Sequence, residues 1–341
     1  MQSNNSPLIR STMLTGLEAA ARELDMDLLP ALRASGLAPT LLEAQEHFVS
    51  RQAFSQCLEL LAEQYNCPHL GLVVARHSRA VGSGALAQLA KASPTLGAAL
   101  ANAYPRLRLY TDARWHIKRD GSHVELTCTV PHSRNSQRPQ IQSLSIAQHA
   151  KAIRELLGDH WAPTSVSFAF PAPEKRQHYK RYFAAPVYFD QEYDGLRFPA
   201  QDLDIPITSH DPELLAILEH YLASPALEIA PDLAGRVSTI ICQQLGNGRC
   251  GMQDVANILD WHPKALQRAL RAEGSTFKDL LLSARLDLAE QHLSRSRIGL
   301  AALADMLGYS CPSALSRAFK QRHGMSPRAW RQRMAADRPS A

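Results

Sequence analysis

The sequence has no long apolar run and few residues arranged for redox or metal chemistry. No stretch approaches the roughly 20 apolar residues of a membrane-spanning helix, and the N-terminal segment MQSNNSPLIRSTM lacks the apolar core of a signal peptide. None of the six cysteines forms a C-x-x-C pair or has zinc-ligand spacing with histidine. We therefore expect a cytoplasmic protein with reduced thiols, no membrane partner, no metal and no cofactor.

Catalytic patterns are also missing. The 14 histidines include no H-E-x-x-H pair, and Gly82-Ser83-Gly84 lacks the G-x-S-x-G spacing of a nucleophile elbow. An enzyme with an appended DNA-binding domain would need a nucleophile or a metal set, and neither is visible. We predict that the protein is not an enzyme.

Charge is distributed unevenly along the chain. The 341 residues carry a net charge of +5, but residues 230–341 hold 16 Lys and Arg against 9 Asp and Glu, a net charge of +7. A basic C-terminal third suggests a polyanion partner, although many solvated helical surfaces are basic too.

The N-terminal part, residues 1–225, is predicted to be an α+β domain with a linker. Apolar residues at helical spacing predict helices at 12–24, 51–65, 96–109, 141–157 and 212–222. Pro105 should kink or end the third of these. Short strands with a small antiparallel sheet are predicted at 113–119, 123–130, 165–170, 187–190 and 195–198. The first two should form a hairpin with a type I′ turn around Asp120-Gly121.

The C-terminal part contains an internal repeat with a period close to 49 residues. One copy begins at Val255 and the other at Leu303. Both read apolar-Ala-x-x-Leu, a turn residue, an aromatic residue, a polar cap, and then Leu-x-Arg-Ala-apolar-basic. Each copy is consistent with a helix-turn-helix, because Gly308 suits a left-handed turn and a proline fits the first turn of each second helix. Asp260 occupies the matching turn position of the first copy, where it tolerates the left-handed conformation less well than glycine.

A long helix is predicted between the copies, at residues 277–293. The residues predicted on its buried side are Leu280, Leu281, Ala284, Leu288 and Leu293. This helix would be roughly 25 Å long. That length can hold two recognition helices about one DNA turn, near 34 Å, apart.

These residues resemble the AraC/XylS family of transcription regulators. The second copy, from Leu303 to Lys320, followed by Gly324–Pro327 and Trp330-Arg331, is similar to the family signature almost throughout. The chain departs from it where Asp260 replaces the usual turn glycine and Trp330 the more usual tyrosine. The resemblance covers about residues 233–331. It implies an all-α DNA-binding domain at 226–341, with two helix-turn-helix units joined by a long helix.

More weakly, the N-terminal region resembles the sensor domain of one AraC subgroup. The matching stretches are 70–72, 82–89, 93–100, 185–189 and 196–198. That domain is called arabinose-binding by inheritance, and the label says little about the ligand. The resemblance implies a domain that binds an effector of unknown identity, dimerises, or both.

The exposed faces of the second helices and the resemblance together indicate which residues bind DNA. Base-edge readers are expected at Lys264, Gln267, Ser313 and Ser316. DNA contacts are implied at Arg268 and Arg317, for which a solvated arginine or an intradomain salt bridge stays open. Phosphate contacts are expected at Arg271, Lys320 and Arg322. His262 and Ser310 are expected to cap their helices, touch phosphate, or do both.

The expected function is that of a one-component transcription regulator. Its partners would be double-stranded promoter DNA, RNA polymerase, a small-molecule effector and a second copy of the chain in a homodimer. Activation is the commoner outcome in the family. The alternatives are an effector-independent repressor or an architectural protein whose N-terminal domain only dimerises.

Overall fold

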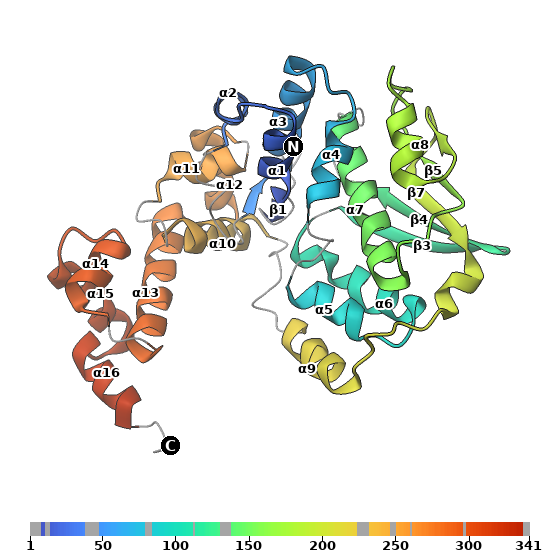
Figure 1. Cartoon of the computed structure of the whole chain (residues 1–341). Helices are drawn as coiled ribbons and strands as arrows, with labels where there is room; N and C mark the ends of the chain where they lie inside the picture. The colour runs from blue at the N-terminus through green and yellow to red at the C-terminus, as the bar shows by residue number, and fades with distance from the viewer. Residues whose placement is uncertain are drawn as a thin grey trace. The chain divides into compact units, whose positions relative to one another are not determined.

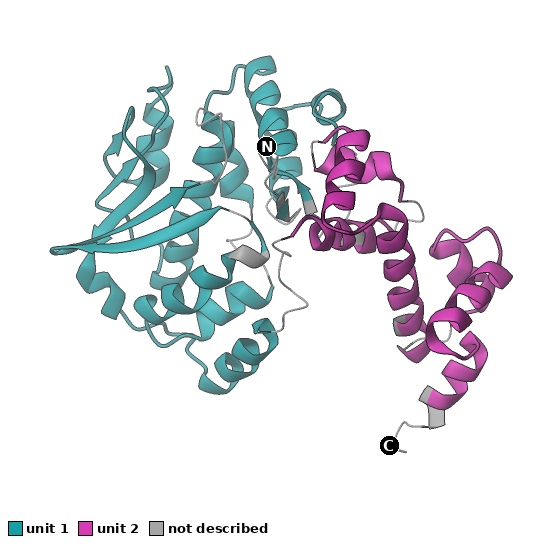
Figure 2. Ribbon diagram, turned by 180° about the vertical axis from the view of Figure 1, so that it is seen from behind, with its two compact units in different colours: residues 1–228 teal, residues 229–341 magenta. Residues whose placement is uncertain are grey.

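The structure is a computed structural model that describes residues 8–10, 14–37, 48–78, 84–111, 113–129, 138–223, 232–245, 250–259, 261–295 and 298–336. The chain folds into two compact units, Met1–Glu228 (unit 1) and Ile229–Ala341 (unit 2), which Figure 2 shows in teal and magenta. Residues 12–13, 82–83, 130 and 260, and the predicted boundary near residue 225, lie outside the described residues.

Unit 1 combines helices with a mixed sheet (Figure 1). Its helices are α1 (Leu17–Glu23), α2 (Leu29–Ala34), α3 (Arg51–Gln64), α4 (Leu70–His77), α5 (Ala85–Ala92), α6 (Leu96–Ala103), α7 (Pro139–Leu157), α8 (Gln177–Phe183) and α9 (Pro212–Leu222). The helices predicted at 51–65, 141–157 and 212–222 are confirmed. The one predicted at 96–109 ends as an α-helix at Ala103 and continues through Pro105 as the 3₁₀ helix η3 (Tyr104–Leu109).

The main sheet has five strands in the order β3-β4-β7-β5-β6. They are β3 (Arg114–Asp120), β4 (His123–Thr129), β5 (Ser165–Ser167), β6 (Val187–Tyr188) and β7 (Asp194–Pro199). All neighbours are antiparallel except β5 and β6, which are parallel because α8 lies between them in the chain and returns it to the same end. The sheet is therefore mixed, whereas an antiparallel one was expected. A separate pair joins β1 (Leu8–Arg10) and β2 (Phe48–Ser50).

The hairpin between β3 and β4 is confirmed, but its turn is shifted by one residue. Asp120 pairs with His123, so the two loop residues are Gly121 and Ser122. Only Gly121 has a positive φ, +57°. A positive φ at the first loop position alone matches a type II′ turn rather than the predicted type I′, and glycine is favoured at that position.

Helix α7 is the centre of unit 1. One side packs on the sheet at β7, and α3 and α4 pack on the other side (Figure 1). Its contact with α4 is close at Gly71, whose N–H donates to the buried Gln140 side chain at 3.0 Å. Gln140 in turn donates from Nε2 to the carbonyl of Pro68 at 3.1 Å. Glycine is required here, since a Cβ would lie 2.2 Å from the carbonyl oxygen of Gln140.

Unit 2 is all-helical. Its helices are α10 (Leu233–Leu245), α11 (Met252–Ile258), α12 (Pro263–Ala272), α13 (Phe277–Arg295), α14 (Leu300–Met306), α15 (Pro312–His323) and α16 (Pro327–Ala336). The long helix predicted at 277–293 is α13, whose 19 residues span about 28 Å. In Figure 1, α10–α12 lie along one end of α13 and α14–α16 along the other.

Across the described ranges, no helix is both long and apolar enough to cross a membrane. The same residues contain no group of three or more His, Cys, Asp or Glu side chains placed to hold a metal ion.

We expect Gly71→Ala to destabilise unit 1 by about 1–3 kcal/mol, because α4 must move away from α7 to admit the methyl group. Denaturant unfolding followed by circular dichroism measures the change. Gly299→Ala is the control, since no atom lies within 4 Å of a Cβ there. Equal unfolding midpoints for the two variants would contradict the close-contact argument.

Candidate nucleic-acid interface

The two repeat copies fold as two helix-turn-helix units that share the same backbone hydrogen bond and the same buried alanine. In the first, α11 and α12 form the pair, and in the second α14 and α15. The backbone N–H of Trp261 donates to Ala256 and that of Tyr309 to Ala304, each at 2.8 Å. Both alanines are buried, at 0% and 1% exposure. A small residue at this point lets the second helix cross the first closely.

The apolar positions predicted to hold each unit together are buried. They are Val255, Leu259, Leu266 and Leu270 in the first unit and Leu303, Leu307, Leu315 and Phe319 in the second. Gly308 has the predicted left-handed conformation, with φ of +70°. Gly274 and Gly324, with φ of +74° and +73°, follow the ends of α12 and α15. The predicted turn at Asp260 lies outside the described residues.

Helix α12 presents one polar face to solvent. Lys264, Gln267, Arg268 and Arg271 are all exposed. Within the described part of the chain these four side chains form no hydrogen bond or ion pair, so the intradomain salt bridge considered for Arg268 is not formed there. His262 caps the helix, because its Nδ1 accepts from the N–H of Lys264 at 3.3 Å.

Helix α15 presents a second polar face, with one difference from the prediction. Ser310, Ser313, Arg317 and Lys320 are exposed, but Ser316 is half-buried and less accessible to a groove. Arg317 and Lys320 also lack hydrogen bonds and ion pairs among the residues described. Ser310 is not the cap of this helix, because the N-cap position belongs to Cys311.

Cys311 is a residue of this face that the sequence analysis did not single out. Its Sγ lies 3.1 Å from Oγ of Ser313. Hydrogen bonding by this hydroxyl and by the first backbone N–H groups of α15 lowers the pKa of the thiol. The hydroxyl of Ser313 is therefore shared with the thiol at the start of α15. The repeat pattern gave no signal for this, since His262 and not cysteine occupies the matching N-cap position of the first copy.

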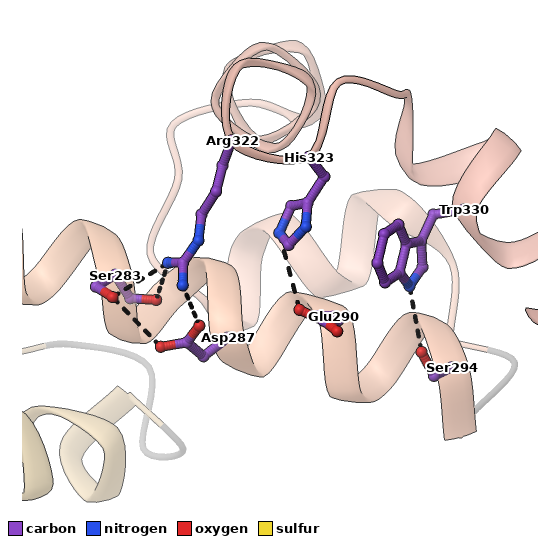
Figure 3. A network of polar contacts seen from close by, with 7 residues as sticks. All are labelled: Ser283, Asp287, Glu290, Ser294, Arg322, His323 and Trp330. Atoms are coloured by element: carbon purple, nitrogen blue, oxygen red, sulfur yellow. Dashed lines mark hydrogen bonds and ion pairs between the residues drawn. The ribbon is translucent and has the colours of Figure 1, made fainter.

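Arg322 points away from this polar face and toward α13. Figure 3 shows its guanidinium over the first half of that helix. Nη1 donates to the carbonyl oxygen and to Oγ of Ser283 at 3.2 and 3.1 Å, and Nη2 donates to Asp287 at 2.6 Å. Arg322 was expected to contact phosphate. The structure instead gives its guanidinium three partners inside unit 2, and its role toward DNA stays a prediction.

Two further contacts continue this polar network along α13 (Figure 3). Nε2 of His323 lies 3.9 Å from a carboxylate oxygen of Glu290, and Nε1 of Trp330 donates to Oγ of Ser294 at 3.2 Å. The ring of Trp330 also meets that of Phe319 edge-on, with centroids 5.7 Å apart. Trp330 of α16 thus packs against both α15 and α13.

Tyr309 also makes its ring contact inside unit 2. The guanidinium of Arg285 on α13 lies 5.1 Å from the centre of its ring, within the range of a cation–π contact. Burial raises the pKa of Tyr309, so its hydroxyl stays protonated.

Two family models match the chain. Residues 26–207 match the model described as the arabinose-binding domain of AraC transcription regulator, N-term. Residues 255–333 match the model described as a helix-turn-helix domain, which spans both repeat copies.

Relatives match over nearly the whole chain. The HTH-type transcriptional regulator VirS of Mycobacterium tuberculosis is 31% identical over 334 residues, which cover 95% of this chain and 96% of VirS. The ornithine utilization regulator of Pseudomonas aeruginosa is 23% identical and covers 88% of this chain and 89% of its own. The crystal structure of the transcriptional regulator CdpR from Pseudomonas aeruginosa aligns with a TM-score of 0.44 at 20% identity, covering 89% and 96% of the two chains.

The two matched models account for both units, and the similarity to VirS extends across both. The chain therefore belongs to the AraC family of DNA-binding transcription regulators, with an arabinose-binding-type N-terminal domain and a C-terminal helix-turn-helix domain that binds DNA.

Proposed function

We propose that the protein reads a promoter by inserting α12 and α15 into successive major grooves, and that an effector bound by its N-terminal part, residues 1–225, controls this binding. The observation that carries the proposal is the duplicated polar face. Two helices in equivalent positions of the repeat each expose basic side chains that have no partner among the described residues, and α12 exposes the amide of Gln267 as well. Side chains of this kind supply the donors that base edges and phosphates accept.

The two helices differ in chemistry. Helix α12 exposes Gln267 beside Arg268, and a glutamine can bond an adenine through two hydrogen bonds. Helix α15 exposes a hydroxyl of Ser313 and the charges of Arg317 and Lys320. Two different readers in tandem suit a site built of unlike or directly repeated halves better than a palindrome.

Activation through RNA polymerase and homodimerisation complete the proposal. We expect residues 1–225 to form the dimer contact and residues 226–341 to bind DNA. A reporter gene placed behind a fragment selected from genomic DNA tests the direction of regulation. Activation appears as higher expression with the protein present, and lower expression would support the repressor alternative.

Gln267→Ala and Arg268→Ala should each weaken binding to the selected fragment by about 1–3 kcal/mol, because each would remove a hydrogen-bonded base contact. Binding to random DNA should change much less. Fluorescence anisotropy with both DNAs measures the two affinities. Arg33→Ala, which removes an exposed arginine of unit 1, is the charge-matched control. An equal loss on both DNAs would make these two residues phosphate contacts.

Lys320→Ala should weaken binding to every DNA and lower the slope of log affinity against log salt by roughly one unit, since one phosphate contact is lost. Anisotropy titrations at four or more salt concentrations give the slope. A slope equal to that of the wild-type chain would remove Lys320 from the interface.

Arg322→Ala should act on stability as well as on binding, because its guanidinium joins α15 to α13. The pair with Asp287 is partly exposed, so a double-mutant cycle with Asp287→Ala should give a coupling of about 0.2–1 kcal/mol in unfolding. Lys320→Ala, on the same helix without such partners, should leave stability within about 0.5 kcal/mol. A zero coupling together with a full unit of salt slope would assign Arg322 to phosphate alone.

A further inference from the structure

Helix α9 exposes a row of large apolar side chains. Ile217 and Tyr221 are 65% and 55% exposed, and in the described part of the chain no other large apolar side chain is as exposed as these two. They lie four residues apart and therefore share one side of the helix. Leu214, half-buried, continues the row three residues before Ile217. Single exposed apolar side chains are ordinary, whereas a contiguous group of them marks a surface that contacts another molecule.

A different side of α9 holds this helix on unit 1. Leu215, Leu218 and Leu222 pack in an apolar cluster with residues of α5. At 100° per residue, these three leucines point about 100° away from the exposed row. Asp211 caps the helix, because its Oδ1 accepts from two backbone N–H groups of the first turn at 3.0 Å each. The helix is thus anchored on unit 1 while the exposed row stays open.

The exposed row is complementary to itself when two copies of α9 run antiparallel. A twofold axis through Ile217 places this residue against Ile217 of the second copy. Positions 213 and 221 then lie level with each other across the axis, because each is four residues from it. Glu213 carries an exposed carboxylate in the first turn, and Tyr221 carries an exposed hydroxyl in the last turn. The hydroxyl can donate to the carboxylate on both sides of the axis.

The charge of α9 does not suit a polyanion as the occupant of this row. The helix contains no lysine or arginine, and it carries the carboxylates of Glu213 and Glu219. DNA would be repelled by these charges. A second copy of the same helix instead supplies an apolar row of equal length, a hydroxyl for each carboxylate, and an antiparallel helix dipole.

We propose that the exposed row of α9 is the homodimer contact, with two copies of the chain packed antiparallel about Ile217. The inference rests on the proposed function, in which residues 1–225 form the dimer contact, and it names the surface. One helix face is at the small end of specific protein interfaces, so the dimer dissociates on dilution. Because α9 is the last described helix of unit 1, this pairing sets the distance between the two points from which the chains continue toward their DNA-binding helices.

Sedimentation velocity of the full chain over a series of concentrations measures the dimer dissociation constant. Ile217→Glu should raise this constant by roughly a hundredfold or more, since two carboxylates would meet at the axis. Ile117→Glu is the matched control, because it makes the same change at a 41% exposed position of β3. This control should leave the constant unchanged. Both side chains are exposed, so both variants should keep the circular dichroism of the wild-type chain.

The polar pair across the axis has its own test. Tyr221→Phe keeps the ring but removes the donor, and Glu213→Ala removes the acceptor. Each should weaken the dimer by roughly tenfold, and the double variant should weaken it no further, because all three lose the same hydrogen bonds. Glu219→Ala, on the side of α9 opposite the exposed row, should leave the dimer unchanged.

Oxidative cross-linking tests the position of the axis. Ile217→Cys should form a disulfide with its own copy and give a covalent dimer on a non-reducing gel. Ala216→Cys, at the exposed neighbouring position, should give no more dimer than the wild-type chain, whose native cysteines set the background. An Ile217→Cys chain that gives only this background would overturn the antiparallel contact.

The sedimentation result also separates this inference from the proposed function. A dimer that persists unchanged in Ile217→Glu would overturn the α9 surface and leave homodimerisation in place. A wild-type chain that is monomeric at every concentration would overturn the surface and homodimerisation together. Neither outcome touches DNA reading by α12 and α15, which anisotropy with the selected fragment measures independently.

Discussion

Helix α13 holds both halves of unit 2 because its apolar residues lie on two sides. Leu286, Ala289 and Leu293 are buried in one cluster with the residues of the second helix-turn-helix. Ala284 is buried outside that cluster, in the half of the helix against which α10 packs. At about 100° per residue, Ala284 and Leu286 point roughly 160° apart. The first helix-turn-helix is thus joined to α13 through α10, and the second packs on α13 directly, toward the other end of this helix.

The polar residues of unit 2 fall into two groups, those with hydrogen-bonding or charged partners inside the unit and those without. Arg322, Arg285 and Trp330 direct their polar or charged ends at α13 or its neighbours, and they hold α15 and α16 at a defined rotation about that helix. Gln267, Arg268, Arg317 and Lys320 have no such partners in the described ranges. The first group positions Arg317 and Lys320 of α15, since a groove contact requires the side chain to arrive at a fixed angle.

Local sequence signals predicted the elements whose pattern is decided within one turn or one repeat. The helices at α3, α7 and α9, the left-handed glycine at 308 and the buried faces of both repeats follow from spacing alone. Of the residues predicted on the buried side of α13, Ala284 and Leu293 are buried, and Leu280, Leu281 and Leu288 are half-buried. The prediction missed the buried Leu286 and Ala289, because two separate groups of helices pack on α13 and its apolar residues do not follow one stripe. The parallel pairing of β5 and β6 and the partners of Arg322 also depend on tertiary neighbours, which periodicity does not encode. The half-buried position of Ser316 likewise depends on tertiary neighbours and could not be predicted from periodicity.

The contacts that hold α9 to the rest of unit 1 show why sequence distance is a poor guide to tertiary contact. The carbonyl oxygen of Ala92, where α5 ends, accepts from Nδ1 of His210 at 2.7 Å and from the N–H of Asp211 at 3.2 Å, just before α9 begins. Leu86 of α5 and Leu222 of α9 are buried in one cluster. More than 100 residues separate these partners in the chain, and each apolar residue reads as ordinary core on its own helix. Periodicity therefore predicts that α5 and α9 are helices with a buried side, but not that they pack on each other.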